Sequence, residues 1–202
     1  MALITAAYVK DYLPELSTST GADAIITTII GRVETQFAKY IGFPRADSGV
    51  YTLDATTYTV YIDHPMYGNP DVLELPVRPV SAVASLHSDV DRAYGSDKLI
   101  AASEYELDSE YARIILKPNT ATQTFERGFK ANKVVCTGGF AAAPADLAHA
   151  ICYQCALVFR NRPNIGNDTI SQRQASVKLR RIILEDEVRE ILFDLRPAGV
   201  VL

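Results

Sequence analysis

The chain has 202 residues, of which 48% are hydrophobic and 22% charged, and its formal net charge is -4 at pH 7. These values are typical of a soluble globular protein with one domain or two small ones. The negative balance argues against general binding to nucleic acid or to an anionic membrane, because neutralising phosphates requires clustered Lys and Arg. It does not argue against a protein that DNA passes without sticking.

Two helices are predicted at the start of the chain. Thr5 can cap a short helix over residues 6–13, which Pro14 ends. Apolar residues then recur every three or four positions from Ile25 to Ile41, and Gly42 after them is a natural stop. Gly31 within this second helix costs about 1 kcal/mol relative to Ala. It marks either a close approach to another helix or a chance choice.

The middle of the chain is predicted to form strands, because its apolar residues alternate or occur in short β-branched runs. Together these strands are expected to form an antiparallel meander. The polar stretch 119–132 is predicted to be a mobile loop. The expected strands cover residues 52–62, 73–75, 80–86, 105–107, 113–116 and 133–137.

Helical spacing returns after Pro144, a residue that the first turn of a helix tolerates. The helix that runs from there to about Arg162 is apolar around most of its circumference, so we expect it to be the most buried. The polar stretch 164–176 is predicted to be flexible. A last helix is expected over residues 177–195, followed by a short apolar tail over 198–202.

Helical ends around a strand-rich middle predict an α+β protein. In this interpretation residues 1–47 and 143–202 form one discontinuous helical bundle, and residues 48–142 form an inserted antiparallel β-sheet domain. Charge follows the same division. Residues 48–142 contain 8 Lys or Arg and 12 Asp or Glu, whereas residues 143–202 contain 8 and 7.

Patterns that look catalytic have simpler interpretations. Cys152 and Cys155 form a CxxC motif, but they lie inside a predicted buried helix and not at its N-terminus, where the helix dipole would activate a thiol. His149 cannot converge with both on one ion, because helix positions six residues apart face different directions. Three cysteines, an odd number, do not indicate a disulfide framework, so we expect a reducing compartment.

Two further patterns are also explained without a site. The pair Gly138-Gly139 lacks the residues of a phosphate loop and is interpreted as a turn between sheet and helix. The run His87-Ser88-Asp89 contains triad residue types, but adjacent side chains do not face one another. No catalytic, cofactor or metal residue is therefore predicted, and the chain is expected not to be an enzyme. No stretch approaches the roughly 20 apolar residues of a membrane span, so no membrane partner is expected.

Two charged regions are candidate surfaces. An alternating acidic row is interpreted as a solvated face or as a surface that repels DNA or contacts a neighbour. Residues 160–181 are basic, and they are interpreted as surface charge or as a docking site for an acidic protein. The apolar tail would be disordered, add a strand or tuck under that partner. The acidic row is Glu104, Glu106, Asp108 and Glu110; the docking candidates are Arg173, Lys178, Arg180, Arg181, Arg196, Val200, Val201 and Leu202.

Four stretches, in this order, resemble the head-tail connector (adaptor or head-completion) proteins of tailed bacteriophages. The first is Tyr8-Val-Lys-Asp-Tyr-Leu13 with the helix that follows it, and the second is Leu75-Pro-Val-Arg-Pro-Val-Ser-Ala-Val83, which leads into a strand. The third joins Val134-Val-Cys-Thr-Gly-Gly-Phe140 to Pro144-Ala-Asp-Leu-Ala-His-Ala150, although the family usually has a Tyr or Thr pair where Cys136-Thr137 stands. The fourth is Glu187-Val-Arg-Glu-Ile-Leu-Phe-Asp-Leu-Arg196.

The resemblance implies a structural protein of the virion, assembled in the bacterial host cytoplasm. Its copies would form a homo-oligomeric ring, about twelve around a closed cyclic axis, beneath the portal protein. The C-terminal segment would dock to the portal, and the other side would receive a stopper or tail-completion protein. Genomic DNA would pass through the channel without specific binding, and no cofactor is implied. Two alternatives stay open: a small hydrolase or lyase with a cleft between sheet and helices, and a DNA-binding packaging protein.

Overall fold

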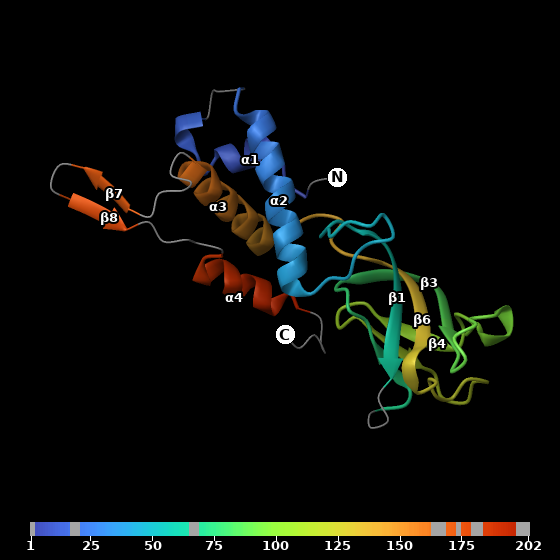
Figure 1. Ribbon diagram of the computed structural model, residues 1–202. Coiled ribbons are helices and arrows are strands. Elements are labelled where there is room, and N and C mark those ends of the chain that lie inside the picture. The colour runs from blue at the N-terminus through green and yellow to red at the C-terminus, as the bar shows by residue number, and fades with distance from the viewer. Residues whose placement is uncertain are drawn as a thin grey trace. The chain divides into compact units, whose positions relative to one another are not determined.

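The computed structural model describes residues 3–16, 21–64, 69–162, 169–172, 175–178 and 184–196. They divide into two compact units, which are described separately here. The described part of unit 2 comprises residues 3–34 and 143–194, and that of unit 1 comprises residues 35–142 with Leu195 and Arg196. The predicted α+β class is confirmed, because the chain contains helices and antiparallel sheets (Figure 1).

Unit 2 contains the helices α1 (Ala6–Lys10), α3 (Ala145–Asn161) and α4 (Asp186–Asp194), the short 3-10 turn η1 (Pro14–Leu16) and the first part of α2 (Asp23–Ile41). α3 is the most buried of these, as predicted, and its buried positions occur on nearly every turn. They are Leu147, Ala148, Ala150, Ile151, Cys152, Gln154, Cys155 and Ala156. None of the described helices is long and apolar enough to cross a membrane.

Polar side chains join the two ends of the chain within unit 2. The hydroxyl oxygen of Tyr12, after α1, lies 2.8 Å from Nδ1 of His149 on α3. Arg160, near the end of α3, donates from Nε to Glu15 Oε1 at 3.2 Å. His149 Nε2 also lies 3.7 Å from Glu187 Oε1 on α4. Segments far apart in the sequence are therefore held in one compact unit.

The helix α2 follows the predicted pattern. Ile26, Ile30 and Val33 are buried at three- and four-residue spacing. Gly42 has φ 97°, the left-handed conformation expected of a glycine that ends a helix.

Replacing Gly31 by Ala should stabilise the protein. A Cβ added to Gly31 meets no other atom within 4 Å, so the proposed close approach of another helix is absent at this position. Because Ala loses less backbone entropy on folding, we expect the free energy of unfolding to rise by about 0.5–1 kcal/mol. Urea unfolding followed by circular dichroism measures the change. A loss of stability would show that the residue has a packing role.

Unit 1 contains two antiparallel three-stranded sheets. In one, β6 (Gly128–Gly138) lies between β1 (Thr56–His64) and β3 (Val80–Ser88). In the other, β5 (Arg113–Leu116) lies between β2 (Val72–Glu74) and β4 (Tyr105–Asp108). Each sheet buries one face. The buried residues include Tyr58, Val60, Leu86 and Val134 from the first sheet and Leu73, Ile114 and Leu116 from the second.

Three details of the predicted organisation are wrong. The strands form no simple meander, since β1 pairs with the distant β6. β6 begins at Gly128, inside the stretch predicted to be a loop: Gly128 pairs with His64, and Asn132 pairs with Ile62 and Ser88. The predicted helix over residues 177–195 is shorter. α4 covers only Asp186–Asp194, and β8 (Ala175–Lys178) pairs with β7 (Thr169–Gln172) where a flexible stretch and helix were expected.

The β7–β8 hairpin has a physical explanation. Its strands carry the β-branched residues Thr169, Ile170 and Val177, which favour extended backbone. Ile170 and Val177 are paired directly across the two strands. This pairing is invisible to a periodicity argument applied to one segment at a time.

Candidate functional site

The four carboxylates of the predicted acidic row occupy different environments in unit 1. Glu106 and Glu110 are exposed, whereas Glu104 and Asp108 are half-buried. Glu104 Oε2 accepts the backbone N–H of Thr122 at 2.8 Å, and Asp108 Oδ1 accepts that of Tyr111 at 3.2 Å. Glu104 and Asp108 therefore stabilise turns of the chain by accepting backbone hydrogen bonds. No such bond is described for Glu106 or Glu110.

The tertiary fold adds basic residues to this row. Asp108 is paired across the strands with Arg113, and Arg113 with Glu74, so their side chains share the outward face of the sheet. Arg113 Nη2 lies 3.3 Å from Glu74 Oε1. We call Glu74, Glu106, Asp108 and Glu110 the acidic face. Its charge is reduced but not cancelled by the arginines beside it.

An exposed aromatic ring lies beside the acidic face. Tyr111 is 50% exposed. The guanidinium carbons of Arg78 and Arg113 lie 5.8 and 5.6 Å from its ring centre. Arg78 also donates from Nε to the carbonyl oxygen of Glu110 at 2.6 Å. These contacts fix the direction of the two arginines and of the turn that contains Tyr111 and Glu110.

The predicted docking residues are mostly outside the described residues. Arg173, Arg180, Arg181, Val200, Val201 and Leu202 all fall there. Lys178 is the last residue of β8. Arg196 is described, and its guanidinium carbon lies 4.6 Å from the ring centre of Tyr40. Arg160, from the same basic region, contacts Glu15 within unit 2, as described above.

A second surface was missed by the sequence analysis. Tyr61 on β1 is paired with Lys133 on β6, and the ring centres of Tyr61 and Tyr94 lie 5.6 Å apart. Lys133 Nζ lies 5.6 Å from the ring centre of Tyr94, and Lys130 Nζ lies 5.0 Å from that of Phe129. We call these five residues the aromatic–basic patch. Tyr61 and Phe129 are 47% and 64% exposed.

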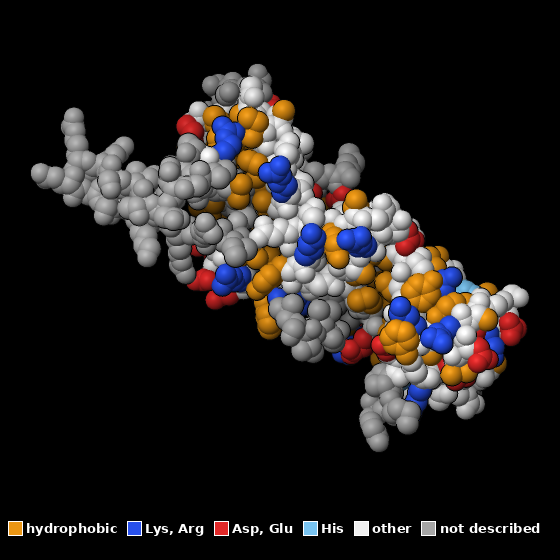
Figure 2. Space-filling view, in the orientation of Figure 1, with side chains coloured by type: hydrophobic (Ala, Val, Ile, Leu, Met, Phe, Trp, Pro, Cys, Tyr) orange, Lys and Arg blue, Asp and Glu red, His pale blue; other side chains and the backbone are white. Residues whose placement is uncertain are grey.

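Hydrophobic side chains mixed with Lys or Arg gather over the strands of unit 1 on the side seen in Figure 2. Only part of the aromatic–basic patch could be anticipated from the sequence. The strand predicted over residues 52–62 has a period of two, and this alternation places Tyr61 on the side opposite Tyr58 and Val60. Tyr94 lies between the expected strands, and Phe129 lies in the stretch that was predicted to be a loop. Nothing in the sequence indicated that the hydroxyl of Tyr94 reaches the carbonyl oxygen of Lys130.

The loop that carries Tyr94 is organised by a single carboxylate. Asp89 is 2% exposed and accepts the backbone N–H groups of Asp91, Ala93 and Tyr94 at 2.8–3.0 Å. The hydrogen bond from Tyr94 is the largest cause that lowers the pKa of Asp89. Arg92 and Tyr94 have φ 61° and 50°, so the loop needs this support to keep two non-glycine residues in the left-handed region.

The Asp89→Asn variant should be less stable than wild type at pH 7, and the difference should shrink in acid. Asp89 has a lowered pKa in the folded state, so its contribution is present above the unfolded pKa of about 4 and is lost as pH falls through the folded pKa. Thermal unfolding measured between pH 7 and pH 3 tests this. A difference that stays constant over this range would contradict the prediction. Asp97→Asn is the matched control, because Asp97 is an exposed carboxylate of the same unit.

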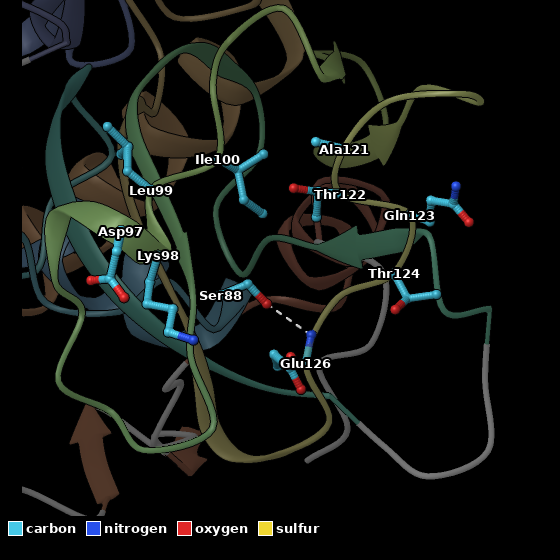
Figure 3. Close-up of a pocket in the computed structure, with 10 residues that line it drawn as sticks. All are labelled: Ser88, Asp97, Lys98, Leu99, Ile100, Ala121, Thr122, Gln123, Thr124 and Glu126. Carbon is cyan, nitrogen blue, oxygen red and sulfur yellow. Dashed lines mark hydrogen bonds between the residues drawn. The ribbon is translucent and has the colours of Figure 1, made fainter.

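A polar pocket of about 460 Å³ opens in unit 1. Residues 97–100 line one side, residues 121–124 with Glu126 line the other, and Ser88 lies between them (Figure 3). The Ser88 hydroxyl donates to Asn132 Oδ1 at 2.7 Å and accepts the N–H of Glu126 at 2.8 Å. No His or Cys is among the lining residues, and in Figure 3 the carboxylate of Asp97 points away from Glu126. These lining residues present neither an activated nucleophile nor a facing carboxylate pair.

Cys152 and Cys155 are core residues, as predicted, and Cys136 on β6 is buried as well. Cys136, Cys152 and Cys155 are at most 1% exposed. Burial raises the pKa of Cys136 to about 11 and that of Cys152 to about 12, and it raises the pKa of Cys155 as well. Such thiols are protonated at neutral pH and poor as nucleophiles. Among the described residues no group of three His, Cys, Asp or Glu side chains is placed to hold a metal ion.

No family model matches this chain, and no curated protein matches it. Solved structures do. A chain from the neck of the empty gene transfer agent (GTA) particle, computed with C6 symmetry, superposes with a TM-score of 0.59 at 18% identity, covering 98% of this chain and 92% of the other. A chain from the neck of the native particle, computed with C12 symmetry, gives 0.51 at 17% identity, with 97% and 91% covered.

A third match, from the virion of the native particle, has a TM-score of 0.52 at 19% identity and covers 98% of this chain and 92% of that one. Identities this low establish likeness of fold alone. The matches cover 97–98% of this chain, so they extend over its helices and its sheets. The resemblance to head-tail connectors predicted from sequence is confirmed at this level: the chain has the fold of proteins in the neck of gene transfer agent particles.

Proposed function

We propose that this chain is a structural, non-enzymatic head-tail adaptor of a tailed phage or a phage-like particle. The observation that carries the proposal is the fold likeness over 97–98% of the chain to proteins from particle necks. The C6 and C12 symmetries of those necks support a ring of identical copies around one axis. In this role the protein works by assembly, and its surfaces matter more than any single side chain.

The proposed ring, of about twelve copies, assembles beneath the portal protein in the bacterial host cytoplasm and remains in the virion at the head-tail interface. It extends the DNA channel and offers a platform to a stopper or tail-completion protein. We assign the acidic row to the surface that lines the channel or contacts a neighbouring copy. Its negative charges would repel DNA phosphates at short range. DNA then passes without specific binding.

Residues 1–47 and 143–202 form, in this proposal, one helical bundle that builds the ring, and residues 48–142 form the inserted domain. Support comes from the contacts of Glu15 with Arg160 and of His149 with Tyr12 and Glu187, which tie the two ends of the chain together. The C-terminal segment docks to the portal through Arg173, Lys178, Arg180, Arg181 and Arg196 and through the apolar residues Val200, Val201 and Leu202. Its basic residues suit an acidic partner.

Negative-stain imaging with purified portal protein from the same particle tests the proposal. We expect a ring of this protein on one end of the portal. The variant Arg180→Glu with Arg181→Glu should dock more weakly, whereas the same reversal at Arg45 and Lys117, outside the C-terminal segment, should dock normally. A portal that carries no ring under any condition tried would contradict the adaptor role.

Two other functions make different predictions. A DNA-binding packaging protein would bind duplex DNA with a steep dependence on salt concentration, and we expect no such binding from the purified chain. A small hydrolase or lyase would require convergent reactive groups. The lining of the pocket beside Ser88 provides no such support.

A further inference from the structure

We propose that the aromatic–basic patch of one copy binds the acidic face of a second copy of this chain. The inference rests on the proposed ring and names two surfaces through which neighbours meet. Both belong to unit 1, so their positions on one compact body are described by the structure. The patch comprises Tyr61, Tyr94, Phe129, Lys130 and Lys133, and the acidic face comprises Glu74, Glu106, Asp108 and Glu110.

The two surfaces are separate faces of unit 1. Tyr61 and Lys133 lie opposite each other on β1 and β6, and Tyr58 and Val134 of the same strands are turned into the core. Glu74, Glu106 and Asp108 of the acidic face lie on the outward side of the other sheet, whose inward side buries Leu73 and Ile114, and Glu110 lies in the turn after β4. Because each sheet turns its remaining face inward, one copy cannot lay its patch on its own acidic face. Contact requires a second copy.

The charges of the two surfaces are complementary. Lys130 and Lys133 supply the positive charge of the patch, while in the adjoining loop the exposed Arg92 is balanced by the exposed Asp91. On the acidic face, four carboxylates face two arginines, and Glu106 and Glu110 are exposed. Complementary potentials of this kind select a partner and fix its register. Two aromatic–basic patches facing each other would instead repel, because both carry lysines.

Aromatic side chains give the contact an apolar component. Tyr61 and Phe129 are exposed on the patch, and Tyr111 is 50% exposed beside the acidic face. Ile115, on the same outward side as Glu106, is 37% exposed. Tyr and Arg are the residue types most enriched at the centres of protein interfaces. Each surface therefore combines buriable rings with charges at their edge.

Both surfaces are rigid before they meet. Asp89 fixes the loop that presents Tyr94, and the hydroxyl of Tyr94 donates to the carbonyl oxygen of Lys130. The backbone N–H of Lys130 is held by Asp63 Oδ1 at 2.7 Å. On the other surface Arg113 joins Glu74 across two strands. Little side-chain ordering is then required on binding, which reduces the cost of association.

Two unlike surfaces on one chain make a heterologous contact. Repeated head to tail, such a contact closes into a ring when the rotation between neighbours divides a full turn. This is the property that an adaptor ring requires. It also means that every copy contributes both surfaces, so a compensating change can be placed in the same chain.

Sedimentation velocity of the full chain over a range of concentrations tests the pairing. We expect the wild-type protein to self-associate. Two double variants should each associate about tenfold or more weakly. One carries Lys130→Glu with Lys133→Glu, and the other carries Glu106→Lys with Glu110→Lys. The variant carrying all four changes should recover association to within about threefold of wild type, since the charges are then exchanged. Lys39→Glu with Arg45→Glu alters two exposed basic residues outside both surfaces, beside Tyr51, and should change nothing.

Circular dichroism of each variant checks that it is folded. The inference is overturned if wild type stays monomeric at every concentration, if the reversals leave association unchanged, or if the four-fold variant is not rescued. The inference is also overturned if the wild-type protein binds a short DNA duplex and the variant with Lys130→Glu and Lys133→Glu does not. The portal imaging judges the adaptor role independently, so a ring on the portal that tolerates the reversals would remove only this pairing.

Discussion

Replacing Gly139 by Ala is expected to lower the free energy of unfolding by about 3 kcal/mol or more. Gly139 has φ 98°, and a Cβ added there would lie 2.5 Å from the carbonyl oxygen of Asp54 and 2.8 Å from that of Leu53. Both obstacles are backbone atoms, which cannot rotate aside as a flexible side chain does. The predicted turn after β6 is thus confirmed, and its tight packing explains the glycine.

The effect is large because this turn connects three segments of unit 1. The N–H of Gly139 donates to the carbonyl of Pro79 at 2.9 Å, and that of Phe140 donates to the carbonyl of Leu53 at 2.8 Å. The N–H of Ala55 returns to the carbonyl of Phe140 at 2.9 Å. Moving the chain to accommodate a Cβ would break several of these bonds at once.

Two glycines serve as matched controls for Gly139. Gly128 has φ 134° but open space around it, so Gly128→Ala should show the cost of backbone strain alone. Gly21 has neither a positive φ nor a neighbour within 4 Å, so Gly21→Ala should be nearly neutral. Urea unfolding should show the largest loss of stability for Gly139→Ala, a smaller loss for Gly128→Ala and almost none for Gly21→Ala. Equal losses at Gly139 and Gly128 would show that the overlap with Asp54 is relieved at no cost.

Replacing Asn132 by Ala should lower the free energy of unfolding by about 2–3 kcal/mol, because buried polar groups lose their partners. Asn132 is completely buried on β6. Its Oδ1 accepts from the Ser88 hydroxyl at 2.7 Å, and its Nδ2 donates to the carbonyl of Glu126 at 3.0 Å. The N–H of Glu126 in turn donates to Ser88 Oγ, which closes a small network under the polar pocket.

A double-mutant cycle with Ser88→Ala tests whether these residues act as one network. The double variant should lose less stability than the sum of the two single variants, because the second change removes a group that the first has already left without its partner. Urea unfolding of the four proteins at one pH gives the coupling free energy. Strict additivity would show that Ser88 and Asn132 contribute independently.

The elements of this fold were largely readable from local pattern. The isoleucines of α2 repeat at helical spacing, and the strand over Arg113–Leu116 was predicted with the bounds that the structure has. The spacing of β-branched and apolar residues predicts such elements because it depends only on which side of the element faces the core. The burial of α3 followed from the same argument.

Pairing and surface composition were not readable in this way. That Arg113 stands between Asp108 and Glu74 depends on which strands lie side by side, and the aromatic–basic patch depends on a loop folding back over β1 and β6. The last helix was predicted too long and the β7–β8 hairpin was missed, because strand pairing can override a helical pattern. Each of these features depends on contacts between segments, which the pattern of a single segment does not report.

The sequence by itself determined the α+β class, the burial of Cys152 and Cys155 and the resemblance to head-tail connectors, because each follows from residue type and local order. The tertiary structure alone decided which charges stand together. The acidic row became a face that includes arginines, and Tyr61 and Lys133 became part of a patch with Tyr94, Phe129 and Lys130. The physical reason is that periodicity fixes the direction of a side chain, whereas its neighbours are fixed by contacts between remote segments.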